Sequence, residues 1–323
     1  MYSPPNFMVA LVMTAFSAVF WGSWANSYKG AKKYPFELFY WDYIVGVVLC
    51  SLVFALTLGS HGSSGESFIA NVSAANRVNI VYAMVGGFIF NIANLLLVAG
   101  IAIAGLAIAF PIAIGIAVVE GVVLSYALQP KGNPLYLAMG VGLATLAIIF
   151  DALAYKRLSG GVTVTRKGII VNVISGLLMG GFAPFVTKSL TTEHTLTPYS
   201  VAVFFSLGAF VCCFFINPYL MKHPLLGEPV SFSGFWNTSA RNHLLGLFGG
   251  VVWGLGGCFN FVAAGFVGVA ISYAIGQSSP MIAALWGVLV WKEFRGADNQ
   301  AWTYLGLMFL SYIAAVISIA MAY

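Results

Sequence analysis

Amide, hydroxyl and aromatic side chains, rather than charges, are the groups within the apolar runs of this sequence that could recognise another molecule. Asn and Gln carry a hydrogen-bond donor and an acceptor together, which suits an amide, urea or lactam, and an aromatic face can stack on a planar ring. The pattern therefore favours a pocket for a small, neutral solute that forms several hydrogen bonds. The candidate pocket residues are Trp24, Asn26, Asn91, Asn94, Asn260, Tyr273, Gln277 and Ser278.

The same amides could instead connect one helix to another. A hydrogen bond between membrane helices contributes about 1 kcal/mol and needs no ligand. This alternative stays open for any single amide, but it explains the whole set less well.

Carboxylates within the apolar runs are the candidates for handling a proton, because ionisation is costly in a membrane and depends on access to water. Asp42 opens one run and Glu120 lies in the middle of another, and either could bind a coupled proton. The alternatives are helix N-capping by Asp42 and burial of Glu120 as a neutral, hydrogen-bonded acid. We interpret Asp151 as a helix-edge ion pair beside Lys156 and Arg157 in preference to a coupling site.

Motifs for catalysis and ATP-driven pumping are missing from the sequence. We find no phosphate-binding loop, dinucleotide fingerprint, zinc-binding HExxH or Ser-His-Asp arrangement, and no repeated ion-filter segment. The cysteines lie in apolar runs without disulfide or metal-ligand spacing. We therefore expect no enzyme activity, no metal and no cofactor, and we favour a carrier that uses an existing gradient.

The composition indicates an integral membrane protein. Hydrophobic residues make up 60% of the 323 positions and charged residues 7%, whereas a soluble protein has about 25% charged residues. With about 20 apolar residues per span, we predict about ten helices in an all-α protein. The predicted helices lie near residues 7–28, 38–58, 78–99, 103–127, 133–154, 168–188, 198–217, 243–265, 268–291 and 301–322.

Basic residues are distributed unequally between the two sets of connecting loops. Eleven Lys and Arg fall on one side of the predicted membrane and three, Arg77, Lys131 and Lys188, on the other. Because cytoplasmic loops are enriched in Lys and Arg, we predict that both termini are extracytoplasmic, in the plasma membrane or bacterial inner membrane. The expected partners are a small-molecule substrate, a proton and the lipid bilayer, with no nucleic acid; no oligomeric state is indicated.

The two halves of the sequence are similar to each other. Gly86-Gly87 aligns with Gly249-Gly250 and Gly105 with Gly268, while the run 17–25 resembles 175–183 at nearly the same offset. A repeat of five helices, an odd number, must place its second copy upside down, which is the inverted-repeat architecture of secondary transporters. We predict repeats at 1–155 and 156–323.

Several short motifs in order along the chain resemble the ureide permease family of the drug/metabolite transporter (DMT) superfamily, and more distantly the rhamnose–proton symporters. The motifs are Gly22-Ser23-Trp24, Tyr40-Trp41-Asp42-Tyr43, Gly86-Gly87 with Asn94, the run 223–229, Gln277 with Pro280, the run 286–289, and Glu293-Phe294-Arg295. The resemblance implies ten helices in two inverted repeats and proton-coupled import of a ureide such as allantoin or a nucleobase such as uracil.

Four functions are compatible with these features of the sequence. We expect a proton-coupled importer of a ureide, nucleobase or nucleoside. A sugar–proton symporter of the rhamnose type is the first alternative, since its pocket also needs amides and aromatic rings. A multidrug exporter would be expected to have a more acidic pocket, and a sensor without transport leaves the paired half-sites unexplained.

Overall fold

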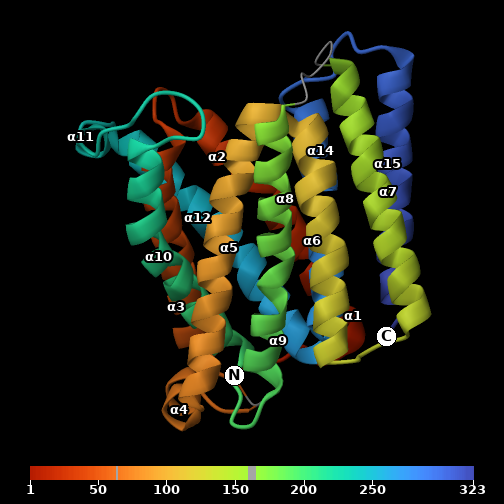
Figure 1. The fold of residues 1–323 in the computed structure, drawn as a ribbon. Helices are drawn as coiled ribbons and strands as arrows, with labels where there is room; N and C mark the ends of the chain where they lie inside the picture. The colour runs from red at the N-terminus through yellow and green to blue at the C-terminus, as the bar shows by residue number, and fades with distance from the viewer. Residues whose placement is uncertain (63–64, 159–164) are drawn as a thin grey trace.

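The computed structural model describes residues 1–62, 65–158 and 165–323, and within these ranges the secondary structure is helical, without strands. Nine of the described helical segments are long and apolar enough to cross a membrane, so the protein is an all-α membrane protein (Figure 1). The helices are α1 (Phe7–Ser23), α2 (Ala25–Gly30), α3 (Phe36–Leu56), α4 (Phe68–Ala74), α5 (Arg77–Ala104), α6 (Leu106–Leu128), α7 (Pro134–Leu158), α8 (Arg166–Gly181), α9 (Ala183–Thr191), α10 (Pro198–Lys222), α11 (Ser233–Trp236), α12 (Ala240–Val267), α13 (Val269–Gly276), α14 (Ser279–Leu289) and α15 (Asn299–Ala320).

The predicted helix 268–291 is divided into α13 and α14. Gln277 and Ser278 form the break, and Pro280 occupies the first turn of α14, where its missing N–H is tolerated. The two halves have 8 and 11 residues, and a complete span needs about 20. The break therefore places Gln277 between two short helices inside the bundle, where its side chain is buried.

Two further helices are interrupted at single aromatic residues. Trp24 separates α1 from α2, and Phe182 separates α8 from α9. The backbone stays close to helical at both residues, with φ of −56° and −74°. The sequence comparison of 17–25 with 175–183 aligns these two positions.

Glycines allow close contact at two helix crossings. A Cβ atom at Gly87 of α5 would overlap the carbonyl of Phe205 in α10, and one at Gly250 of α12 would overlap the carbonyl of Tyr43 in α3. At Gly105 and Gly268 the backbone has φ of 74° and 93°, a region that glycine adopts without strain. These glycines lead from α5 into α6 and from α12 into α13.

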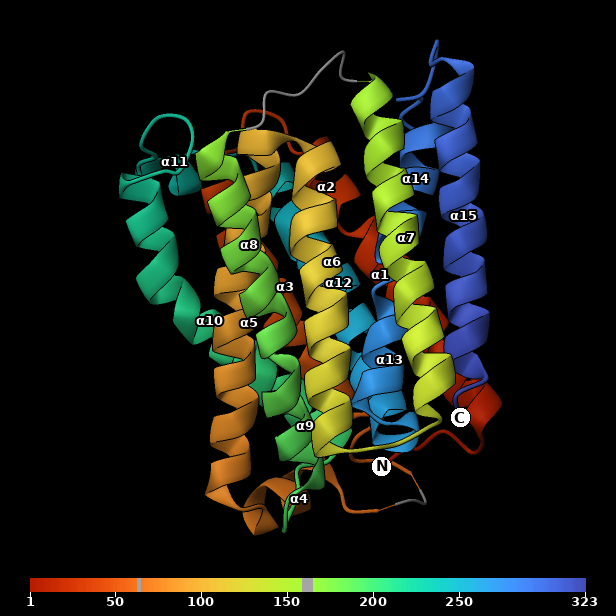
Figure 2. The ribbon, with the colours of Figure 1, turned by 45° about the vertical axis from the view of Figure 1, so that its right-hand side comes forward.

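The packing pairs are arranged similarly in the two halves. Helix α1 packs against α12 and α8 against α5, while α3 packs against α12 and α10 against α5. Helices α7 and α15 lie side by side at one edge of the bundle, outside the other helices (Figures 1 and 2). The proposed repeat boundary near residue 155 falls at the end of α7.

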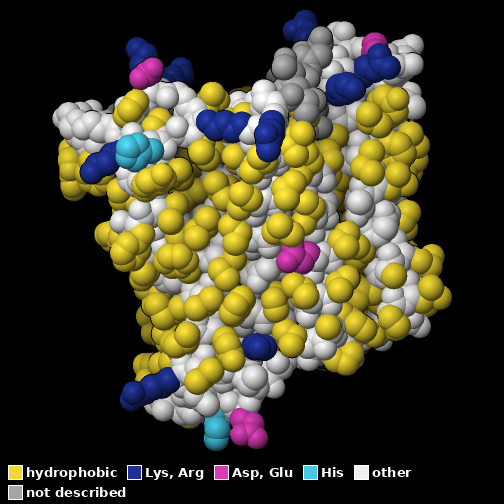
Figure 3. Space-filling model, in the orientation of Figure 1, with side chains coloured by type: hydrophobic (Ala, Val, Ile, Leu, Met, Phe, Trp, Pro, Cys, Tyr) yellow, Lys and Arg dark blue, Asp and Glu magenta, His cyan; other side chains and the backbone are white. Residues whose placement is uncertain are grey.

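Both chain termini lie at the same end of the bundle (Figures 1 and 2). On the face drawn in Figure 3, most Lys and Arg side chains gather at the opposite end, with few near the termini. We call the end that carries the loops after α2, α10 and α14, together with the C-terminal end of α7, the basic end. This arrangement agrees with the predicted separation of basic loops from termini, and the side of the membrane stays a prediction.

Two positions differ from the sequence interpretation. Helix α3 begins at Phe36 with Pro35 as its N-cap, so Asp42 lies in the second turn and does not cap the helix. Helix α7 continues to Leu158, so Asp151 lies about two turns inside the helix instead of at its edge. Helix α3 begins two residues before the predicted run, at Phe36 and Glu37. Helix α7 extends four residues past its predicted end, because Lys156 and Arg157 continue its last turn.

Candidate functional site

A cavity of about 400 Å³ lies between the helices and reaches the basic end. Its wall includes six of the eight predicted pocket residues: Trp24, Asn26, Asn94, Asn260, Tyr273 and Gln277. Pockets for small molecules usually have volumes of about 300–1,000 Å³ and mostly apolar walls. This cavity has the same character, since aromatic and aliphatic side chains surround a few amides.

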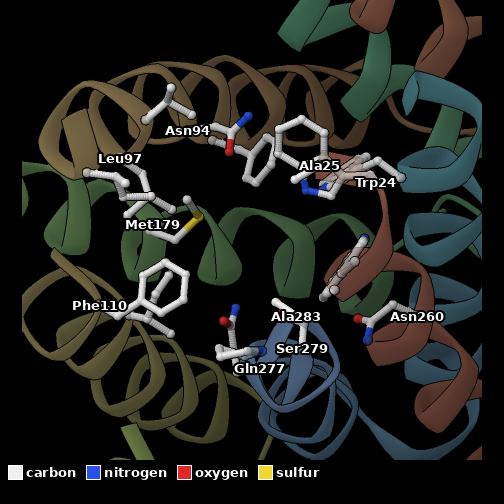
Figure 4. Close-up of a pocket in the computed structure, with 18 of the residues that line it drawn as sticks. Trp24, Ala25, Asn94, Leu97, Phe110, Met179, Asn260, Gln277, Ser279 and Ala283 are labelled. Carbon is white, nitrogen blue, oxygen red and sulfur yellow. The ribbon is translucent and has the colours of Figure 1, made fainter. Parts of the chain in front are cut away.

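Asn94 and Asn260 use their amide groups in the same way. Asn94 Nδ2 donates to the hydroxyl of Tyr40 at 3.1 Å, and Asn260 Nδ2 donates to the carbonyl of Ser272 at 2.9 Å. Each side chain then keeps its oxygen as an acceptor, and Figure 4 shows both oxygens turned towards the open centre of the cavity. The pair therefore offers two fixed acceptors to a solute with N–H or O–H donors.

Gln277 supplies both kinds of hydrogen-bonding group. It lies at the break between α13 and α14, and its amide points into the cavity from the wall opposite Asn94 (Figure 4). A primary amide can donate and accept at once. Gln277 can therefore bind a solute carbonyl and an adjacent N–H, as a lactam or ureide presents them.

Aromatic rings make up much of the remaining wall. The Trp24 ring lies 4.9 Å from that of Tyr43, and Phe90 lies 4.8 Å from Trp253. Phe110 faces the cavity from α6, with Leu97 and Met179 beside it (Figure 4). Such a wall can hold a flat ring between apolar faces.

Asn91 and Ser278 do not line the cavity. Asn91 is buried and accepts a 2.8 Å hydrogen bond from the Tyr40 hydroxyl. Asn91 therefore positions Tyr40, whose hydroxyl accepts the hydrogen bond of Asn94. The Ser278 hydroxyl donates to the carbonyl of Ile275 at 2.7 Å, next to the helix break. Both side chains therefore stabilise residues next to the cavity wall without lining it.

Tyr273 lines the cavity with its ring, and its hydroxyl is engaged elsewhere. The hydroxyl lies 3.0 Å from the carbonyl of Met179 and 3.3 Å from that of Ala117. It therefore fastens α13 to α6 and α8. A solute in the cavity would contact the ring of Tyr273, not its hydroxyl.

Polar contacts at the basic end of the cavity join α2 to the segment after α14. Lys29 and Glu293 form an ion pair of 2.5 Å, and Trp291 Nε1 donates to Asn26 Oδ1 at 2.6 Å. At the other end the cavity wall is buried and apolar, with Val186 and Val269 1% and 4% exposed. The cavity thus reaches the partly exposed residues Lys29 and Glu293 at the basic end, and it ends in a buried wall towards the termini.

Asp42 belongs to a separate polar cluster between α3 and α12, outside the cavity wall. Its carboxylate lies 2.9 and 3.0 Å from Nδ1 of His243 and accepts a 2.8 Å hydrogen bond from Tyr34. Burial and the hydrogen bond to Asp42 raise the pKa of Tyr34, so this hydroxyl remains a donor. No local motif in the sequence connects His243 to Asp42, because the two residues lie 201 positions apart.

Glu120 is also outside the cavity wall. Glu120 lies in α6, on the side that packs against α8. It packs against Gly180, and its Oε2 has no hydrogen-bond partner within the described ranges. The alternative of a fully hydrogen-bonded buried acid therefore does not describe it.

Asp151 lines the cavity, although the sequence analysis interpreted it as an edge ion pair. The ion pairs among the described residues join Lys29 to Glu293, Arg157 to Asp298 and His243 to Asp42. Asp151 is in none of them. The interpretation was wrong because Arg157 lies beyond Asp151 along α7 and turns to the loop that precedes α15.

A discontinuous helix and a mostly apolar cavity with a few amides, inside an all-helical bundle, are the features of a membrane carrier. The sequence profile of the ureide permease family matches residues 39–160 and 156–323, so the chain belongs to this family and is a transporter. Ureide permease 1 of Arabidopsis thaliana is 25% identical over 86% of this chain and 87% of its own length. Ureide permease 2 of the same plant is 21% identical over 86% and 87%.

Two other similarities agree with this family and fold. A putative sugar uptake protein of Listeria monocytogenes is 22% identical over 84% of this chain and 90% of its own length. A protein of known crystal structure, 13% identical, superposes with a TM-score of 0.65 and covers 96% of this chain and 97% of that chain. The second similarity concerns the fold alone.

Proposed function

We propose that this protein imports a small neutral heterocycle with several N–H groups, a ureide such as allantoin or a nucleobase such as uracil or its nucleoside. The observation that carries the proposal is the arrangement of amides in the cavity. Asn94 and Asn260 give their N–H groups to the protein and present oxygens, and Gln277 adds a donor and an acceptor. Such a solute has the N–H donors and the carbonyl that this set requires.

The family relatives support the same class of solute, since the Arabidopsis relatives are named ureide permeases. A sugar is the second candidate, favoured by the similarity to a putative sugar uptake protein. Hydroxyl groups could also donate to Asn94 and Asn260. The flat aromatic walls near Trp24 and Trp253 favour a planar ring over a sugar.

Alternating access is proposed as the mechanism. The cavity reaches the basic end in this structure, and this end faces the cytoplasm if both termini are extracytoplasmic. Interruptions at Trp24 and Phe182, and glycine junctions at Gly105 and Gly268, support two repeats of five helices with opposite orientation. Movement of one repeat against the other would close the basic end and open the opposite end.

Uptake into proteoliposomes tests this function. Labelled allantoin, uracil, a nucleoside and rhamnose are offered in parallel, with and without an inward proton gradient. We expect accumulation of a ureide, nucleobase or nucleoside, and at least a tenfold loss of affinity in Gln277→Leu, since one hydrogen bond to the solute contributes about 1.4 kcal/mol. Accumulation of rhamnose alone would favour the sugar symporter.

A further inference from the structure

Two carboxylates, Asp151 and Glu293, line the cavity that holds the candidate solute site. Glu293 is paired with Lys29 at the basic end, whereas Asp151 is 2% exposed and lines the same cavity as Asn94 and Gln277. Of the three acids considered from the sequence, the other two, Asp42 and Glu120, lie outside this wall. A change in the contents of the cavity therefore acts directly on Asp151.

Within the described ranges, the Asp151 carboxyl group forms no ion pair. Its Oδ1 has no hydrogen-bond partner among the described residues. An ionised carboxylate that is buried and unpaired is strongly disfavoured, whereas water or a polar solute can stabilise it. The charge of Asp151 must then depend on whether water fills the cavity.

The groups around Asp151 are neutral hydroxyls instead of cations. Helix α7 packs against α15, α6 and α13. Within electrostatic reach are Tyr155 on its own helix and Tyr312 on α15, and the Tyr312 hydroxyl also has no described partner. On α13 the Tyr273 hydroxyl is bound to backbone carbonyls, and on α6 Glu120 packs against α8.

A polar route leads from Asp151 to the basic end. Tyr155 lies one turn further along α7, within electrostatic reach of both Asp151 and Glu293, and its hydroxyl donates to Glu293 Oε2 at 3.1 Å. Glu293 is 30% exposed and paired with Lys29. Solvent at the basic end can thus exchange protons with Asp151 through the cavity and along this edge.

Asp42, unlike Asp151, has hydrogen-bonding partners. Tyr34 and His243 both contact its carboxylate, so the ionised form of Asp42 is stabilised in every state that keeps these contacts. Such a group suits a structural clamp between α3 and α12. Asp151 suits a site whose proton must leave when the cavity opens.

We propose that Asp151 is the proton-binding group that couples solute import to the proton gradient, with Tyr155 and Glu293 as its route to the basic end. The assignment rests on the proposed function. One proton from the outer solution binds the carboxylate to give the neutral acid, the cavity changes its access, and the same proton leaves to water at the basic end. The solute crosses in the same cycle.

The test separates exchange from accumulation in proteoliposomes. Exchange of labelled for unlabelled solute needs the binding cavity but no net proton movement, whereas accumulation under an inward proton gradient needs the coupling group. Asp151→Asn is expected to exchange the solute and to lose accumulation and solute-driven alkalinisation of the outer medium. Glu228→Gln, which removes an exposed loop carboxylate, is the matched control and is expected to accumulate as the wild type does.

Other outcomes contradict one proposal or the other. Normal accumulation by Asp151→Asn overturns the assignment, and loss of accumulation in Glu120→Gln or Asp42→Asn alone transfers the role to that residue. A wild-type protein that exchanges none of the offered solutes contradicts the proposed function instead.

Infrared spectroscopy tests the assignment without transport, so it also applies if a variant transports poorly or if none of the offered solutes is the right one. Infrared difference spectra between acidic and alkaline buffer are expected to contain a carboxylic-acid band in the wild type that Asp151→Asn lacks and Asp151→Glu shifts. The same band in wild type and Asp151→Asn would show that Asp151 does not bind the proton.

Discussion

Asn94 of α5 donates a 3.1 Å hydrogen bond to the hydroxyl of Tyr40 in α3. The Tyr40 hydroxyl donates in turn to Asn91 Oδ1 at 2.8 Å. The direction of this chain determines which atom of Asn94 faces the cavity, because the amide nitrogen is used inside the protein. The acceptor character of this part of the site thus depends on Tyr40, which does not line the cavity.

Tyr40→Phe should therefore weaken solute binding, although Tyr40 does not line the cavity. Loss of the hydroxyl frees the Asn94 amide to rotate, and we expect affinity to fall about tenfold, equivalent to one hydrogen bond of about 1.4 kcal/mol. Equilibrium binding measures the effect. Tyr219→Phe, at an exposed position of α10, is the control, and equal affinities in both variants would refute the positioning role.

His243→Leu should destabilise the bundle through Asp42. The variant leaves a buried carboxylate without its imidazole partner, and hydrogen bonds to charged groups contribute about 1.5–3 kcal/mol. We expect a lower melting temperature in detergent, with partial recovery in the double variant that also carries Asp42→Asn. His223→Leu, at an exposed position, should have the melting temperature of the wild type. A similar decrease in both variants would contradict the role of His243 and Asp42 as a clamp.

Gly250→Ala should disturb the contact between α12 and α3. The added methyl group would overlap the Tyr43 carbonyl, whereas nothing lies within 4 Å of a Cβ at Gly306. Overpacking costs about 1–3 kcal/mol, so Gly250→Ala should unfold more readily than Gly306→Ala. The measurement is the unfolding midpoint of the purified variants, and equal midpoints would show that the helices separate without cost.

Much of the fold follows from patterns along the sequence. Long apolar runs between basic loops predict the spans. The break beside Gln277 lies inside the run 268–291, which is predicted as one helix, and the polar residues before Pro280 are its local signal. The discontinuity at Trp24 is less visible, since its backbone stays helical and no proline marks it. Local composition thus identifies the helices but not their interruptions.

The contacts of the site depend on neighbours distant in sequence. Asn91 and Asn94 have the same residue type and lie nearly one turn apart on α5, but only Asn94 lines the cavity. Asn91 is bound behind it by the hydroxyl of Tyr40, which also accepts from Asn94. The pairing of Asp42 with His243 joins residues 201 positions apart. Asp151 was misjudged because the sequence shows nearby cations but not the direction in which they turn.

The orientation in the membrane is tested at the C-terminus. We expect a reporter fused after Tyr323 that is active only in the cytoplasm to be silent, because the basic loops lie at the end opposite the termini and basic loops stay inside. The same reporter inserted after Gly227, in the loop after α10, should be active. The reverse pattern would exchange inside and outside throughout the proposed transport cycle.

In the proposed function, Asn94 and Asn260 recognise the N–H groups of a planar heterocycle. Competition by uracil, 1-methyluracil and 1,3-dimethyluracil against uptake of the labelled solute measures this recognition, since methylation removes N–H donors but retains the ring and its carbonyls. Each lost hydrogen bond should reduce affinity about tenfold, from about 1.4 kcal/mol. Equal competition by uracil and its dimethyl derivative would contradict the claim, as would competition by rhamnose but not by any heterocycle.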